Sequence, residues 1–254
     1  MEIQTLAPKI LRDASLDTRS SYFVRWRKTD QCNSRGELSL FSAENNISQR
    51  PSSNTRGLRI YSSIKNDMIF VERLEIYKDG VKLVIVISSD LKYTHEGAES
   101  RALNVAEEIR KKGVSAPICV VAQQDNRKND THNNPEEVQG NILAFYGSDV
   151  KASTLLVDKN DNSEMLKIKF EDWKEELLFL NSHQVIAFHF TVVNGTEPED
   201  SEEIFSNTFP DIPLSTLRLL DESSMTGVNY QVGTKSDFYV GPVYAVVGFR
   251  KFGG

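Results

Sequence analysis

The side chains best suited to metal binding are scattered along this chain of 254 residues. The histidines and cysteines are His95, His132, His183, His189, Cys32 and Cys119. His183 and His189 fall on one predicted strand, where six residues span ~20 Å, too far to share a metal ion. No zinc-type spacing occurs among the six. The sequence therefore predicts no metal site, and it favours surface or hydrogen-bonded histidines.

Residues for nucleophilic or acid–base catalysis form no motif either. A Gly-x-Ser-x-Gly elbow is absent, and Cys119 lies in an apolar run that indicates core packing. Adjacent carboxylates are common, but each pair lies in a polar stretch typical of a solvated face. These pairs are Glu107-Glu108, Glu136-Glu137, Glu175-Glu176 and Glu202-Glu203. We therefore predict no catalytic residue, no cofactor and no enzymatic activity.

One segment has the order of elements found in nucleotide-binding units. A strand-like run at 82–88, an amphipathic helix at 97–112 and a second run at 117–122 form a candidate β-α-β unit. The loop after the first run contains one glycine, and it matches neither a dinucleotide fingerprint nor a P-loop. If a nucleotide binds, Ser88, Ser89 and Asp90 would contact it at the carboxyl end of the strand. A nucleotide-binding enzyme or regulator is therefore an alternative.

The rest of the sequence is rich in strand-like runs, several joined by hairpin signals such as Asp79-Gly80. Strands are expected at 22–27, 37–41, 68–77, 81–88, 117–122, 141–146, 153–157, 165–170, 184–193, 229–232 and 238–252, the last interrupted by Gly241-Pro242. Helices are expected at 2–20, 97–112 and around 170–178. This pattern predicts an α+β protein, mainly an antiparallel β-sandwich with several helices and an N-terminal helical arm.

The expected domain organisation is simple. We expect a helical arm at residues 1–20, followed by a single compact sandwich domain at 21–254 with a long polar loop near 123–140. Residues 1–60 hold ten Lys and Arg and six Asp and Glu, a net charge of +4, which leaves −10 for the remainder. Scattered arginines in that basic part could contact nucleic acid. A capsid-type or movement-type nucleic-acid-binding sandwich protein is a second alternative.

Bulk composition excludes several other classes of protein. Hydrophobic residues make up 39% and charged residues 26% of the chain, enough for a substantial core. No apolar run reaches the ~20 residues that span a bilayer, and the first residues lack the pattern of a signal peptide. Two cysteines are too few for a disulfide framework. We therefore expect a protein without membrane contacts in the cytoplasm, which would be host cytoplasm for a viral protein.

The order of elements also carries a resemblance. A helical arm precedes a strand–turn–strand at Tyr22–Phe41, and a strand near Lys82–Ser88 precedes a long insertion. A helix around Asp172–Asn181 then runs into a strand at Gln184–Val193. This order resembles that of the cypovirus polyhedrins, the matrix proteins of insect-virus occlusion bodies. The resemblance covers most of the chain as an order of elements, and no motif matches residue by residue.

The resemblance implies a function in assembly. Polyhedrins are sandwich proteins that form trimers and pack into intracellular crystals around virions. By resemblance, the arm Glu2–Ser20 would bind neighbouring subunits, since an amphipathic helix at a chain end needs a partner groove. We therefore expect a structural, self-assembling protein that embeds and protects virions. Its partners would be further copies of itself and the virion surface, and the two alternatives above stay open.

Overall fold

The computed structural model describes residues 22–27, 37–42, 57–63, 80–89, 97–124, 140–193, 195–233 and 235–251. These residues form an α+β fold of mostly strands, with three helices and two mixed sheets. The predicted arm at 1–20, the predicted strand at 68–77 and most of the predicted loop near 123–140 lie outside the described residues.

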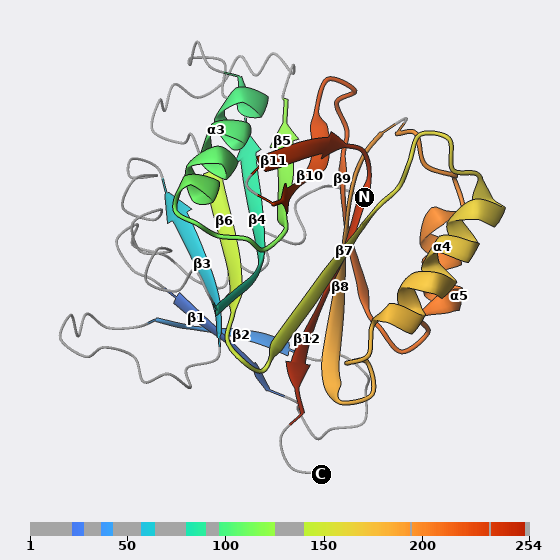
Figure 1. Cartoon of the computed structure of the whole chain (residues 1–254), viewed down its shortest axis with the longest axis horizontal. Helices are drawn as coiled ribbons and strands as arrows, with labels where there is room; N and C mark the ends of the chain where they lie inside the picture. The colour runs from blue at the N-terminus through green and yellow to red at the C-terminus, as the bar shows by residue number, and fades with distance from the viewer. Residues whose placement is uncertain are drawn as a thin grey trace.

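The larger sheet has eight strands (Figure 1). Their order across the sheet is β11 (Lys235–Val240), β10 (Met225–Val232), β5 (Ile118–Gln123), β4 (Val81–Ser89), β6 (Gly140–Tyr146), β3 (Gly57–Ser63), β1 (Tyr22–Arg27) and β2 (Glu37–Ser42). Neighbouring strands are antiparallel except β4 and β5, which are parallel. The helix α3 (Ala98–Lys111) connects these two strands, so the predicted β-α-β unit is confirmed.

The smaller sheet has four strands, in the order β7 (Val150–Leu156), β12 (Val243–Arg250), β8 (His183–Val192) and β9 (Leu214–Leu219). Here β8 and β9 are parallel and are connected by the short helix α5 (Ser201–Thr208). The helix α4 (Ser163–Glu176) comes between β7 and β8. Because each sheet contains a parallel pair, the prediction of a mainly antiparallel sandwich is too simple, and the sheets are mixed.

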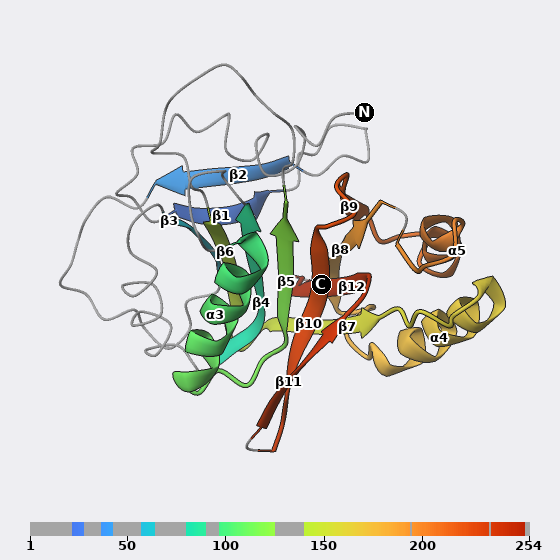
Figure 2. The same ribbon diagram turned by 90° about the horizontal axis from the view of Figure 1, so that it is seen from above.

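The elements stack as helix, sheet, sheet and helix (Figures 1 and 2). Strand alternation explains this order, because successive side chains point to opposite faces of a sheet. On β4, Val84 and Val86 pack in the cluster beneath α3, whereas Leu83 and Ile85 pack in the cluster between the sheets. A third cluster, rich in aromatic rings, lies between the smaller sheet and the helices α4 and α5.

The predicted strand at 165–170 is wrong, because these residues belong to α4. Apolar and basic residues alternate there, which imitates a strand. The buried residues of α4 are Leu166, Phe170 and Trp173, at spacings of four and three that fit one face of a helix. Asn162 begins the helix by accepting a 2.9 Å hydrogen bond from the backbone N–H of Met165. The helix cap at Asn162 and the helical spacing of the buried residues therefore decide the structure of this segment, and the strand-like alternation at 165–170 does not.

Candidate functional site

The structure describes two of the three residues predicted for a nucleotide site. Ser88 and Ser89 end β4, at the carboxyl edge of the parallel pair, and Asp90 lies outside the described residues. Ser88 is buried, and its Oγ has no hydrogen-bond partner in the described part of the chain. The carbonyl oxygen of Ser89 accepts a 3.3 Å hydrogen bond from Arg101 in the first turn of α3. The β-α-β unit therefore brings polar groups to this edge.

A second concentration of polar groups lies beneath α5, and the sequence does not predict it. His189 on β8 is fully buried, and its Nε2 lies 2.9 Å from Glu197 Oε2. The other oxygen of Glu197 accepts a 2.5 Å hydrogen bond from the Thr191 hydroxyl. His189 Nδ1 lies 3.7 Å from Glu202 Oε1, an ion-pair distance, and Arg218 donates to that same oxygen at 2.7 Å. We call His189, Glu197, Glu202 and Arg218 the ionic cluster.

The geometry of the ionic cluster favours a charged imidazole, although His189 Nδ1 forms no hydrogen bond to a described residue. A carboxylate oxygen faces each ring nitrogen of His189, and only the imidazolium carries a proton on both nitrogens. Burial alone would lower the pKa of His189, but the hydrogen bond to Glu197 and the negative charges of Glu197 and Glu202 outweigh it and raise the pKa above its usual value. The nearby His189 imidazolium, followed by the Arg218 hydrogen bond, lowers the pKa of Glu202 to about 2.

Aromatic rings cover the ionic cluster. The His189 ring stacks on Tyr244 of β12, with centroids 4.0 Å apart and planes 8° apart. Tyr244 stacks in turn near Phe205 of α5 at 5.2 Å and meets the edge of Phe170 at 4.9 Å. Burial raises the pKa of the Tyr244 hydroxyl. The cluster thus joins β8, β9 and α5 inside the protein, and its arrangement suits a structural role of holding α5 on the sheet.

The structure tests the predictions for His183 and His189. His183 and His189 both lie on β8 with their side chains on the same face, as the six-residue spacing predicts. His189 is hydrogen-bonded, as expected, but its charged carboxylate partners are not predicted. His183 is also buried, and its Nδ1 lies 2.8 Å from the Ser182 hydroxyl. In the described residues, no His, Cys, Asp and Glu side chains gather in a geometry that could hold a metal ion.

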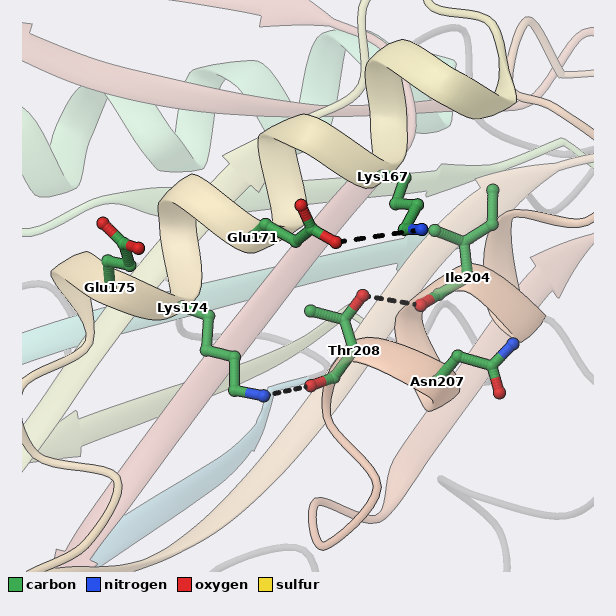
Figure 3. A pocket seen from close by; sticks show the side chains of 7 residues that line it. All are labelled: Lys167, Glu171, Lys174, Glu175, Ile204, Asn207 and Thr208. Carbon is green, nitrogen blue, oxygen red and sulfur yellow. Dashed lines mark hydrogen bonds and ion pairs between the residues drawn. The ribbon is translucent and has the colours of Figure 1, made fainter.

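An open groove of about 750 Å³ separates the outer surfaces of α4 and α5 (Figure 3). Its lining residues are Lys167, Glu171, Lys174, Glu175, Ile204, Asn207 and Thr208. The Lys174 Nζ closes one end by donating a 2.7 Å hydrogen bond to the carbonyl oxygen of Thr208. Lys167 and Glu171 form an exposed ion pair at 4.0 Å. Glu175, predicted to lie on a solvated face, is exposed there, and no predicted site residue lines the groove.

No protein-family model matches the sequence, and no curated protein shows significant similarity to it. Among the helices that the structure describes, none is long and apolar enough to span a membrane.

Proposed function

We propose that this protein is a structural protein that assembles with copies of itself through the edge strand β11. The observation that supports this proposal is the exposure of β11, the outermost strand of the larger sheet. Five of its six residues are exposed. The β10–β11 hairpin also carries large apolar side chains in solvent: Val232 is 62%, Tyr239 44% and Val240 67% exposed. In Figure 2 the hairpin extends beyond the other strands.

An edge strand of this kind is a ready template for pairing. No other strand that the structure describes pairs with its outer backbone N–H and C=O groups, and monomeric proteins usually protect such edges. The exposed apolar side chains lie at both ends of the hairpin, Val232 opposite Lys235 and Val240 opposite Gly227, so they add apolar area along its length. Charge on β11 favours a second copy as the occupant. In an antiparallel pair of β11 strands from two copies, a two-fold axis can place Ser236 opposite Ser236 of the second copy. Lys235 of each copy then lies opposite Asp237 of the other, which gives two pairs of opposite charge.

The concrete form of this proposal is the matrix protein of an intracellular viral occlusion body. The resemblance of the order of elements to that of the polyhedrins supports that form, and it implies a homotrimer built with the arm at 1–20. Pairing of β11 edges would then connect one trimer to the next. Virions would be embedded in the resulting lattice in the host cytoplasm.

Two measurements test self-assembly. Sedimentation of the purified protein should show association that grows with concentration, and microscopy of expressing cells should show particles. The variant Val240→Lys places a charge on the edge and should not associate beyond the trimer. The matched control Leu178→Lys changes an 89% exposed side chain beyond α4 and should associate like the original protein. A protein that stays monomeric at every concentration, or a Val240→Lys variant that associates fully, contradicts the proposal.

A nucleotide-binding enzyme or regulator is the second candidate function. The parallel pairing of β4 with β5 around α3 favours it, because ligands of such units bind beyond the carboxyl ends of the strands. The deciding test is binding of phosphate-bearing compounds to the groups at that edge.

A further inference from the structure

We propose a binding site for a phosphate group at the amino end of α3, with the Ser88 hydroxyl at its base. The site specifies the ligand chemistry of the second candidate function. It does not depend on β11 or on self-assembly. Three observations carry it: a helix start without a side-chain cap, a buried hydroxyl without a partner, and the parallel strands that bring the two together.

The amino end of α3 offers hydrogen-bond donors. The first backbone N–H groups of any α-helix have no partner within the helix, and they carry a partial positive charge. The residue before α3 is Gly97, which has no side chain to accept from them, and no side-chain cap is formed. The amino end of α4 differs, because Asn162 caps it. The two helices are both 14 residues long, so α4 is an internal control for α3.

Ser88 supplies the second, independent observation. It follows Val84 and Val86 on the face of β4 that packs beneath α3. Its neighbour on β5 is Ala122, which lies in the same cluster, so the Ser88 side chain is directed to the α3 side. Ser88 is only 2% exposed, and its Oγ bonds to none of the described residues. Buried hydroxyls almost always have a partner, so the Ser88 hydroxyl has capacity to donate a hydrogen bond to a ligand.

Neighbouring side chains add to the polarity of the site. Gln124 follows β5, and its side-chain nitrogen lies 3.4 Å from where a Cβ on Gly97 would stand. Arg101 lies one turn into α3 and reaches the carbonyl oxygen of Ser89. One group opposes an anion: Glu99 carries a negative charge in the first turn. Glu99 is exposed, so solvent and salt screen its charge.

These donors fit a tetrahedral oxyanion. Phosphate oxygens accept from several backbone N–H groups and a hydroxyl at once, and the helix charge favours the anion. Free phosphate and the phosphates of a nucleotide share this chemistry, so both are compatible with the site. They differ in affinity, because only a nucleotide also contacts the surface around the site.

The test is a titration of the full-length protein followed by NMR of its backbone amides. Inorganic phosphate, pyrophosphate and ATP are added separately at constant ionic strength, with chloride as the reference salt. We expect saturable shifts at Gly97 and in the first turn of α3, and none at Ser163–Met165 of α4. Tighter binding of ATP than of phosphate identifies a nucleotide site, and equal binding identifies a free-phosphate site.

Three variants separate this site from general attraction of anions. Ser88→Ala should weaken binding at least about ten-fold, since it removes a buried donor to a charged group. Glu99→Gln should strengthen binding about two-fold, because it removes the opposing charge at the helix start. The control Ser148→Ala, on the exposed turn after β6, should bind like the original protein.

Several results would overturn the proposal. These are the absence of saturable binding, equal shifts at the starts of α3 and α4, or unchanged affinity of Ser88→Ala. Thermal unfolding of each variant confirms that it is folded before it is titrated. Self-association is measured on the same samples by sedimentation, so failure of phosphate binding and failure of assembly are seen separately.

Discussion

The ionic cluster allows a sharp prediction about stability. The variant His189→Phe keeps a flat ring against Tyr244 but removes the positive charge beside Glu197, whose side chain is 5% exposed. Removing one partner of a buried ion pair leaves the other charge without compensation, which costs about 3–5 kcal/mol. We expect the free energy of unfolding to fall by that amount at pH 6, as measured by urea titration.

A double-mutant cycle isolates the contribution of the pair. Glu197→Gln removes the carboxylate charge but keeps an oxygen that can accept from the Thr191 hydroxyl. In the double variant no buried charge lacks its partner, so it should recover at least about 2 kcal/mol relative to His189→Phe, because neutral replacements of a buried pair are often tolerated. If the losses of the two single variants simply add, His189 and Glu197 are not coupled and the structural argument fails.

The same cluster sets the direction of the pH dependence. The folded pKa of His189 is raised, so its stabilisation is complete below the unfolded pKa of ~6.5 and is lost as the pH rises through the folded pKa. Between about pH 6.5 and pH 8.5, the free energy of unfolding of the original protein should therefore fall relative to that of His189→Phe, while His183, whose pKa burial lowers, contributes equally to both. Above about pH 8.5 burial of Cys119, whose pKa is raised, adds a second loss in both proteins. Equal slopes below pH 8.5 would refute the assignment.

Three further substitutions test other parts of the fold. Asn162→Ala removes the cap of α4 and should cost about 0.5–2 kcal/mol in urea unfolding, with Asn160→Ala in the exposed turn before it as control. Arg110→Met should cost at least about 1.5–3 kcal/mol, since Arg110 donates 2.6 Å hydrogen bonds to Asn229 Oδ1 and to three backbone oxygens. Gly227→Ala should disrupt the β10–β11 hairpin and reduce self-association in sedimentation, because a Cβ there would collide with the Tyr239 carbonyl oxygen and the Phe238 ring.

Local patterns predict much of this fold. The helix at 97–112 corresponds to α3, whose buried residues recur at helical spacing and whose end is followed by Gly113 with a φ of 83°. The strand at 184–193 corresponds to β8, where buried and half-buried residues alternate. These elements are predictable because their own residues carry the periodicity. The parallel pairing of β4 and β5 follows from the same β-α-β order.

Contacts between distant segments are not predictable in this way. The predicted strand at 238–252 proves to be two strands, β11 and β12, which belong to different sheets. The chain passes from one sheet to the other at Gly241, which has a φ of 155°. The sequence shows only that Gly241-Pro242 interrupts the strand-like run. His189 meets Glu202 and Arg218 because α5 folds back over β8, so nothing near His189 in the sequence identifies them. Of the predicted nucleotide contacts, Ser88 and Ser89 stand at the expected edge because strand order alone determines it.

The position of β12 has a consequence for synthesis of the protein on the ribosome. β12 is translated after β7, β8 and β9, yet it lies between β7 and β8. Before β12 is synthesised, β7 and β8 have no strand between them to pair with. The rings of Phe170 and Phe205 also lack their contacts with Tyr244 of β12. The smaller sheet therefore cannot close before β12 has left the ribosome. Until then the side chains that would pack against β12 in this sheet stay incompletely covered.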